Sequence, residues 1–340
     1  IDTAKSLNMP KDNIDRAVAR GSGVGDDSVV LEEINRGCAS TGVTLSVHNS
    51  LLSSPILHFG SQEQHARYFP RLASGEALGA YAITEPDHGS DAAAIETTCR
   101  REGDEWVLNG TKAWITNGSY AEIIVTFATM DPSLRSRGIS AFVIEKSMPG
   151  FSVGKKEKKL GIRGSDTVQL IFDEMRVPAQ NLLGEEGQGF KIAMHTLDGG
   201  RIGIASQAIG IAQACLDEMV DFSETHEMFG RKLADNQLVS HKIAELATRL
   251  DAARLLTRRA AIMKDAGLSH SGEASMAKLN ASEVANDAAR MALEVLGGAG
   301  IGRQSSVERL FRDAKITEIY EGTSQIQSLV ISRHVRSVRG

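Results

Sequence analysis

The sequence predicts an α+β protein with an N-terminal helical region, a middle antiparallel β-domain and a C-terminal bundle of four helices. Before residue 79, apolar residues recur at the three-to-four-residue spacing of helices. From there to Pro178, short apolar runs alternate with turn residues, which is typical of β-structure. After Pro178, long segments have one apolar side, as bundle helices do. We set the domain limits at 24–78, 79–178 and 179–340, with residues 1–23 as a separate segment.

The N-terminal helices are predicted on either side of a turn made of small residues. The apolar residues Val29, Val30, Leu31 and Ile34 lead into a turn over residues 37–42. A second apolar segment and a further helix follow, at residues 51–59 and 61–72.

The β-domain is expected to contain a hairpin and three further strands. Asn109-Gly110 supplies the positive φ angles of a tight turn between strands at 105–108 and 112–116. The other strands are expected at residues 123–128, 139–144 and 167–172.

The four bundle helices are predicted from repeated apolar stripes and a high alanine content. In the first helix, Ile204, Ala208, Ile211 and Cys215 recur at helical spacing. The expected ranges are 201–227, 236–265, 273–296 and 325–338.

The composition argues against nucleic-acid binding, a metal site and a membrane span. The 340 residues are 41% hydrophobic and 24% charged, and the net charge of −5 argues against a general nucleic-acid binder. Cys38, Cys99 and Cys215 are unclustered and lack metal-ligand spacing, so we expect reduced thiols and no metal site. No run of about eighteen apolar residues occurs, so we expect no membrane span.

Glu321 is the main catalytic candidate. It lies in the stretch IYEGTSQIQ (319–327), directly before a Gly-Thr-Ser run that resembles a helix start. A carboxylate in such a loop can be directed into a pocket, and burial would raise its pKa toward that of a useful base. The alternative is an ordinary solvated glutamate.

Three stretches of the sequence show a family resemblance. IYEGTSQIQ, together with YAITEPDHGSD (81–91) and WVLNGTKAWITN (106–117), resembles the acyl-CoA dehydrogenases from about Val29 to the end of the chain. The resemblance is strongest to the short-chain (butyryl-CoA) branch, in segments such as LEEINRGCASTGV, KLGIRGSDT and GFKIAMHTLDGGRIGIASQAIGIAQ.

The resemblance implies an FAD-dependent enzyme of fatty acid β-oxidation that acts on short-chain acyl-CoA thioesters. It implies that Glu321 removes the α-proton, that a hydride passes from Cβ to flavin N5, and that the electrons go to electron-transfer flavoprotein. The Glu321 N–H and a ribityl hydroxyl of the flavin would stabilise the enolate. Some family branches place the base just before Arg201, but this chain has Gly200 there, which favours Glu321.

The resemblance also implies the remaining site residues. Trp114 would stack on the flavin, although a Trp in a strand is otherwise more often part of a sheet core. A structural salt bridge is the alternative for Asp198 and Arg201. The cofactor-binding set is Tyr81, Ile83, Thr84, Ser90, Trp114, Thr116, Phe229, Gln237, Glu294, Gly297, Gly298, Thr323 and Gln325. The substrate-binding set is Ser90, Asp198, Arg201, Tyr320 and Gly322.

The adenine half of FAD would cross a subunit interface in a homotetramer, a dimer of dimers. Two of its residues differ from the family pattern. His226 stands at an arginine position and Glu294 at a glutamine position, so we expect weaker attraction for the diphosphate unless Arg231 compensates.

The first 23 residues differ from the family pattern. They resemble a short helical stretch of the YebC regulators, around NMPKDNI, with a chance amphipathic helix as the alternative. We expect a fusion, a rearranged gene or a faulty gene model in which the first helices of the dehydrogenase domain are missing. Either a mitochondrial matrix or a bacterial cytoplasmic location is consistent with the sequence.

Three other functions stay open at this stage. The chain could be an oxidase that uses oxygen, a catalytically impaired remnant that binds CoA or flavin, or a nucleic-acid-binding regulator. The last is disfavoured by the negative net charge, and the run 155–159 is better explained as a solvated loop.

Overall fold

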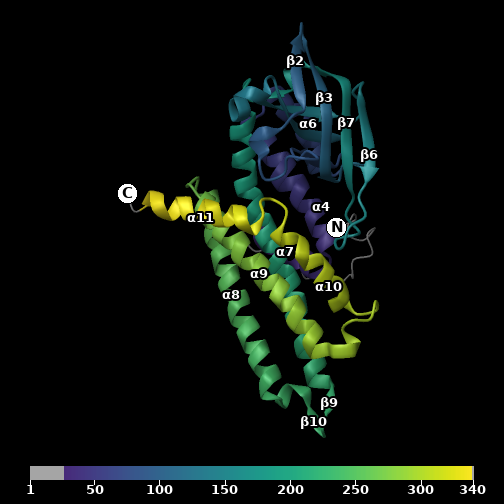
Figure 1. Cartoon of the computed structure of the whole chain (residues 1–340), viewed down its shortest axis with the longest axis vertical. Coiled ribbons are helices and arrows are strands. Elements are labelled where there is room, and N and C mark those ends of the chain that lie inside the picture. The colour runs from purple at the N-terminus through teal and green to yellow at the C-terminus, as the bar shows by residue number, and fades with distance from the viewer. Residues whose placement is uncertain (1–26, 339–340) are drawn as a thin grey trace. The chain divides into compact units, whose positions relative to one another are not determined.

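The computed structural model describes residues 27–338, which form two compact units (Figure 1). We call them the helical unit and the sheet unit. The helical unit contains residues 27–43, 159–164 and 201–338, and the sheet unit contains residues 44–158 and 165–200. The two units are defined by contacts in space. The domain limits predicted from the sequence, at residues 24–78, 79–178 and 179–340, stay predictions.

The N-terminal helices follow one another closely. They are α3 (Asp27–Gly37), α4 (Ala39–Ser46), the π-helical η1 (Val47–Ser53), α5 (Ser54–Phe59) and α6 (Gln62–Ala73). The predicted turn over residues 37–42 is wrong, because only Cys38 separates α3 from α4. Gly42 serves packing instead, since a Cβ there would lie 2.0 Å from the Asn35 side chain. The helix predicted at 61–72 is confirmed, and the Ser61–Gln64 capping box begins it.

The sheet unit contains an eight-stranded sheet in the order β6-β7-β3-β2-β4-β5-β8, with β1 paired to β4. Most neighbours are antiparallel, as predicted, whereas β1–β4 and β2–β4 are parallel. The strands are β1 (Gly79–Ala82), β2 (Thr98–Glu102), β3 (Glu105–Thr116), β4 (Ile123–Thr129), β5 (Ile139–Glu145), β6 (Phe151–Lys156), β7 (Thr167–Pro178) and β8 (Leu182–Leu183).

The hairpin predicted at Asn109-Gly110 is wrong. Strand β3 continues through these residues and pairs with β7 on both sides of them, with a register irregularity between Leu108 and Gly110. Gly110 has a φ of 151°, and a Cβ there would lie 2.5 Å from Thr97 Oγ1. The positive φ therefore serves a β-bulge, and the hairpin turn is at residues 103–104, between β2 and β3.

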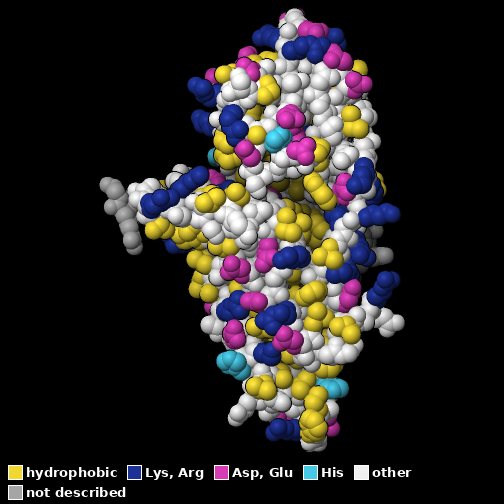
Figure 2. Space-filling model, in the orientation of Figure 1, with side chains coloured by type: hydrophobic (Ala, Val, Ile, Leu, Met, Phe, Trp, Pro, Cys, Tyr) yellow, Lys and Arg dark blue, Asp and Glu magenta, His cyan; other side chains and the backbone are white. Residues whose placement is uncertain are grey.

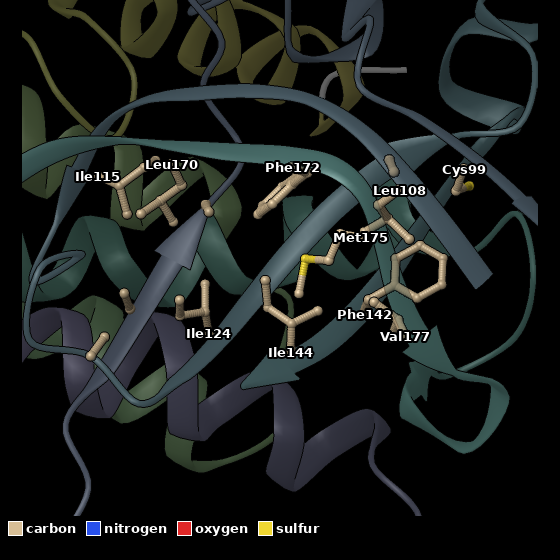
Figure 3. Packing of buried hydrophobic residues seen from close by; sticks show 14 of the residues in the cluster. Cys99, Leu108, Ile115, Ile124, Phe142, Ile144, Leu170, Phe172, Met175 and Val177 are labelled. Atoms are coloured by element: carbon tan, nitrogen blue, oxygen red, sulfur yellow. The ribbon is translucent and has the colours of Figure 1, made fainter. Parts of the chain in front are cut away.

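The core of the sheet unit is built from apolar residues of several strands (Figure 3). Leu108, Phe142, Leu170 and Val177 are all less than 2% exposed. The Trp106 and Phe142 rings meet edge to face, with centroids 5.4 Å apart. This packing fixes the strands that present the site residues described below.

Four long helices dominate the C-terminal part, which confirms the predicted bundle. They are α7 (Gly189–Thr225), α8 (Gln237–Asp265), α9 (Ser271–Leu296) and α11 (Ser324–Val338). In the helical unit, α8 and α9 run side by side, and α11 crosses the start of α9 (Figure 1). The sequence did not indicate α10 (Ser306–Ala314), whose nine residues form one short amphipathic segment. The short strands β9 (Glu227–Met228) and β10 (Arg231–Lys232) lie between α7 and α8.

Six short 3-10 segments lie between the helices and strands of residues 27–338. They are η2 (Ala92–Ala94), η3 (Pro132–Arg137), η4 (Ala179–Asn181), η5 (Leu233–Asp235), η6 (Gly297–Ala299) and η7 (Lys315–Glu318). Across residues 27–338, every helix is too short or too polar to cross a bilayer.

Candidate active site

Glu321 lies in the loop between η7 and α11, and its backbone conformation is unusual. Its φ is 50°, and the next residue, Gly322, has a φ of 89°. A left-handed conformation is strained for a non-glycine residue, and such strain is concentrated at functional sites. The helix predicted after the loop is confirmed, and the Thr323 hydroxyl accepts a bond from Ile326 N at 3.4 Å.

Two buried side chains hold this loop through its carbonyl groups. Gln327 Nε2 donates to the carbonyls of Glu321 and Gly322 at 3.1 and 2.9 Å. Lys278 Nζ, from α9, donates to the Gly322 carbonyl at 2.8 Å. A Cβ on Gly322 would lie 2.7 Å from Gln327 Nε2, so the glycine is required by space as well as by φ.

The residue before Glu321 is anchored separately. The Tyr320 hydroxyl hydrogen-bonds to Gln207 Oε1 on α7. Gln207 is fully buried, and its Nε2 donates to the Ala39 carbonyl at 3.0 Å. The loop is therefore fixed on both sides of the carboxylate.

Burial gives Glu321 the protonation behaviour of a base that works near neutral pH. Desolvation raises its pKa to about 7, while the positive charges of Lys278 and Arg201 act in the opposite direction. Within residues 27–338, its buried Oε2 atom has no hydrogen-bond partner. Arg201 is 5% exposed, and its Nη1 donates to Ser275 Oγ at 3.3 Å. A buried carboxyl group with a raised pKa is a marker of catalytic sites.

In the sheet unit, the segment after β1 lies beside the end of β3. Thr84 accepts a hydrogen bond from the Ala113 amide at 2.8 Å, which brings Ile83 and Thr84 close to Trp114. Trp114 has a φ of 60° and is 58% exposed, so its indole is not part of the sheet core. Tyr81 is buried against Phe127, with centroids 5.2 Å apart. An exposed indole offers an apolar face on which a planar ring system such as the flavin can stack.

A buried ion pair supports this segment, and sequence reasoning missed it. Lys112 Nζ lies 2.7 Å from Glu85 Oε1, and neither side chain is more than 5% exposed. Glu85 also accepts from the amides of Glu96 and Thr97 at 2.6 and 2.9 Å. A lysine in the apolar strand motif LNGTKAWIT was the signal for such a pair, because a buried cation needs a partner.

The other predicted residues of these sets are dispersed. Ser90 is exposed in a bend after β1, Thr116 ends β3, and Asp198 is half-buried on α7. Gln325 is exposed on the first turn of α11.

The predicted adenine-binding residues gather at the other end of the helical unit. Phe229 is 95% exposed between β9 and β10, where apolar side chains reach the surface (Figure 2). Gln237 begins α8, and Gly297 and Gly298 follow the end of α9. Glu294 bonds to Lys242 and Arg290, which lower its pKa. Its negative charge is thus matched locally.

Helix geometry separates these residues from Glu321. Lys278, which contacts the Glu321 loop, and Glu294 are both on α9, sixteen positions apart in number. At 1.5 Å per residue, this corresponds to about 24 Å. Within one helical unit, the predicted adenine-binding residues therefore do not lie next to the Glu321 loop.

Lys278, Gln327 and Gln207 were also missed by sequence reasoning. For Lys278 and Gln207 the signal was a polar side chain at a helix position whose neighbours one turn away are apolar. Lys278 follows this rule, since Ala274, Ala277 and Ala281 around it are fully buried.

The fold and the buried carboxyl group together are typical of an enzyme that uses acid–base chemistry. The sequence matches the N-terminal, middle and C-terminal domain models of the acyl-CoA dehydrogenases over residues 18–76, 80–175 and 187–336. The chain therefore belongs to the acyl-CoA dehydrogenase family. The predicted fold class, enzyme class and FAD dependence are confirmed at the level of this family.

Individual relatives cover most of the chain. It is 54% identical to the mitochondrial short-chain specific acyl-CoA dehydrogenase of Rattus norvegicus over 94% of this chain and 78% of that protein. Butyryl-CoA dehydrogenase of Megasphaera elsdenii has a TM-score of 0.91 and 43% identity, over 93% and 83% of the two chains. A chain described with the electron transferring flavoprotein of Acidaminococcus fermentans has a TM-score of 0.90 and 46% identity, over 91% and 81%.

The resemblance of residues 1–23 to YebC regulators is not supported. The match to the N-terminal domain of the dehydrogenases begins at residue 18, inside that segment. Residues 1–26 lie outside the part of the chain that the structure describes.

Proposed function

We propose that this chain is an FAD-dependent short-chain acyl-CoA dehydrogenase in which Glu321 removes the α-proton of the thioester. The buried carboxyl group of Glu321, with its pKa raised to about 7 and its backbone held in a left-handed conformation, is the observation on which the proposal rests. The product would be the trans-2-enoyl thioester. The names of the relatives from rat and Megasphaera elsdenii support the short-chain substrate class.

Glu321 is suited to this step for two reasons. A base works best when its pKa is close to the operating pH, which burial achieves here. Within residues 27–338, its amide N–H also donates no hydrogen bond, so it can stabilise negative charge on the thioester oxygen. Gly200, which precedes Arg201, offers no competing base.

FAD, when bound, supplies the hydride acceptor that amino-acid side chains lack. We assign its ring to Tyr81, Ile83, Thr84, Trp114 and Thr116, with the exposed indole of Trp114 as the supporting observation. Ser90, Thr323 and Gln325 would bind its more polar parts.

Substrate binding is proposed for Ser90, Asp198, Arg201, Tyr320 and Gly322. Gly322 permits a close approach to the backbone next to the base. Arg201 contributes positive charge near Glu321, because its charge acts on the pKa of that residue.

We assign the adenine half of FAD to Phe229, Gln237, Glu294, Gly297 and Gly298 of a neighbouring copy in a homotetramer. The separation of about 24 Å along α9 supports this division, since it exceeds the reach of contacts within one loop. Sedimentation velocity of the purified holoprotein tests the tetramer, and a monomer with bound flavin would contradict it.

Electron-transfer flavoprotein is the proposed acceptor, in accordance with the description of the Acidaminococcus fermentans relative. A mitochondrial matrix or bacterial cytoplasmic location is proposed from the rat and bacterial relatives.

One experiment tests the function directly. The purified protein should be yellow, and butyryl-CoA added without oxygen should bleach the flavin absorbance. Glu321→Gln should retain flavin, and its rate of bleaching should fall by several orders of magnitude, since the amide cannot accept the proton. Bleaching at the wild-type rate would refute the assignment of the base. Rapid peroxide release under air would identify an oxidase instead, and a colourless protein would indicate an impaired remnant.

A further inference from the structure

Lys278 is a buried cation that the mechanism above does not use. Its side chain is 0% exposed, and it lies on the alanine-rich face of α9. Among the described residues, no carboxylate lies within 4 Å of its ammonium group, which donates a hydrogen bond to the Gly322 carbonyl at 2.8 Å. Burying an ammonium group without a close counterion costs free energy, so packing alone does not explain a lysine at this position.

The charges around Lys278 connect it to Glu321. Glu321 is the strongest favourable charge acting on the ammonium, with Glu318 of η7 weaker, while Arg201 of α7 opposes it. Among residues 27–338, two positive charges oppose the effect of burial on the Glu321 carboxyl group, and Lys278 acts more strongly than Arg201. Tyr320 beside it is half-buried and neutral, since desolvation and the charges of Glu321 and Asp313 raise its pKa.

We propose that Lys278 is a positioning residue for Glu321, in which one ammonium group anchors the Gly322 carbonyl and holds the neighbouring carboxyl group in its basic, charged form. This inference rests on the proposed function, because it takes Glu321 to be the base.

Lys278 and Gln327 share one hydrogen-bond acceptor but differ in charge, so variants of the two residues can separate the effect of the charge from the effect of the hydrogen bond. Both donate to the Gly322 carbonyl, at 2.8 and 2.9 Å, but only Lys278 has a charge. Removing Gln327 should loosen the loop and leave the charge balance intact. Removing the charge of Lys278 should raise the pKa of Glu321, because burial would then be opposed by Arg201 alone.

Lys278→Gln is the decisive variant, since glutamine can still donate to the Gly322 carbonyl and has no charge. The rate of anaerobic flavin reduction rises with pH as Glu321 loses its proton, and we call this rise the acidic limb. In Lys278→Gln the midpoint of the acidic limb should lie about one pH unit or more above the midpoint in the wild type. Lys278→Arg restores the charge and should return the limb close to its original position. Lys278→Met, which removes both donor and charge, should combine the shift with a lower maximal rate.

Two comparison variants separate charge from structure. Gln327→Leu should lower the maximal rate without moving the limb. Lys315→Gln removes an exposed charge six residues before Glu321 and should leave both the rate and the limb unchanged. Each holoprotein is also titrated by infrared difference spectroscopy with ¹³C-labelled glutamate, using Glu321→Gln to identify the Glu321 band. This readout follows the pKa without turnover, so it serves even for a variant with very low activity.

The outcomes are distinct. An unmoved limb and an unmoved infrared titration in Lys278→Gln would overturn the inference, as would equal shifts in Gln327→Leu. If Glu321→Gln reduces its flavin as fast as the wild type, the proposed function itself fails. If Glu321→Gln is inactive and Lys278→Gln titrates normally, only the role of Lys278 is lost.

Discussion

The ammonium of Lys112 and the carboxylate of Glu85 lie 2.7 Å apart inside the sheet unit, and neither is more than 5% exposed. Lys112 also donates to the Ile83 carbonyl at 3.4 Å. Lys112 comes from β3 and Glu85 from the segment after β1, so the pair ties together the two segments that we assign to the flavin ring. Burial lowers the pKa of Lys112 to about 8, although the charge of Glu85 acts in the opposite direction.

Lys112→Met should destabilise the protein strongly, because it leaves the Glu85 carboxylate buried without its counterion. Breaking a buried pair from one side costs about 3 to 5 kcal/mol. Urea unfolding of the purified protein measures this loss. Lys156→Met is the control, since its ion pair to Asp166 has an exposed lysine and should be worth about 1 kcal/mol or less. Similar losses in the two variants would contradict this account of the buried pair.

The pKa of Glu321 predicts opposite effects of pH on activity and on stability. The base must be charged, so flavin reduction should rise with pH through about 7. A carboxyl group whose pKa is higher in the folded state favours folding at low pH, and this contribution is lost between its ordinary pKa of 4.5 and about 7.

Glu321→Gln should therefore be more stable than the wild type at about pH 8, by about 3 kcal/mol. Near pH 4.5 the difference should shrink toward zero, because the wild-type group is then protonated in the folded protein. Urea unfolding at the two pH values measures both differences. A variant less stable than the wild type at the higher pH would mean that burial does not raise the pKa.

Gly322→Ala should damage activity more than stability. Alanine is disfavoured at a φ of 89°, and its Cβ would meet Gln327 Nε2 at 2.7 Å. The strain is of order 1 to 3 kcal/mol, and moving Gln327 would release the carbonyls that fix Glu321. We expect a fall in the flavin reduction rate of at least about tenfold, with flavin content retained. Gly267→Ala is a matched control, since it has a positive φ and open space around it, far along the sequence from the site.

The fold was largely predictable because its signals are local. Long apolar stripes predicted α8, α9 and α11 to within a few residues, and the helix predicted at 61–72 corresponds to α6. The hairpin at Asn109-Gly110 was mispredicted because a bulge and a tight turn both need a positive φ, and only the pairing with β7 distinguishes them.

The site was predictable only in part. Glu321 was found from its motif, whereas Lys278 and the Lys112–Glu85 pair act through contacts between elements distant in sequence. Glu294 shows the same limit. Its charge next to a diphosphate was a concern in the sequence, but the contacts with Lys242 and Arg290 were not visible there.

These contacts lead to a prediction about flavin retention. His226 is exposed, and its ring stacks on Phe222 with centroids 4.7 Å apart. His226→Arg adds a permanent positive charge at the position where the family has arginine, so we expect FAD to bind several-fold more tightly. Glu294→Gln should have a smaller effect, because the negative charge that it removes is already matched by Lys242 and Arg290. Equilibrium dialysis of FAD against the apoprotein measures both affinities. A larger gain from Glu294→Gln than from His226→Arg would show that Glu294 repels the cofactor despite its two cationic partners.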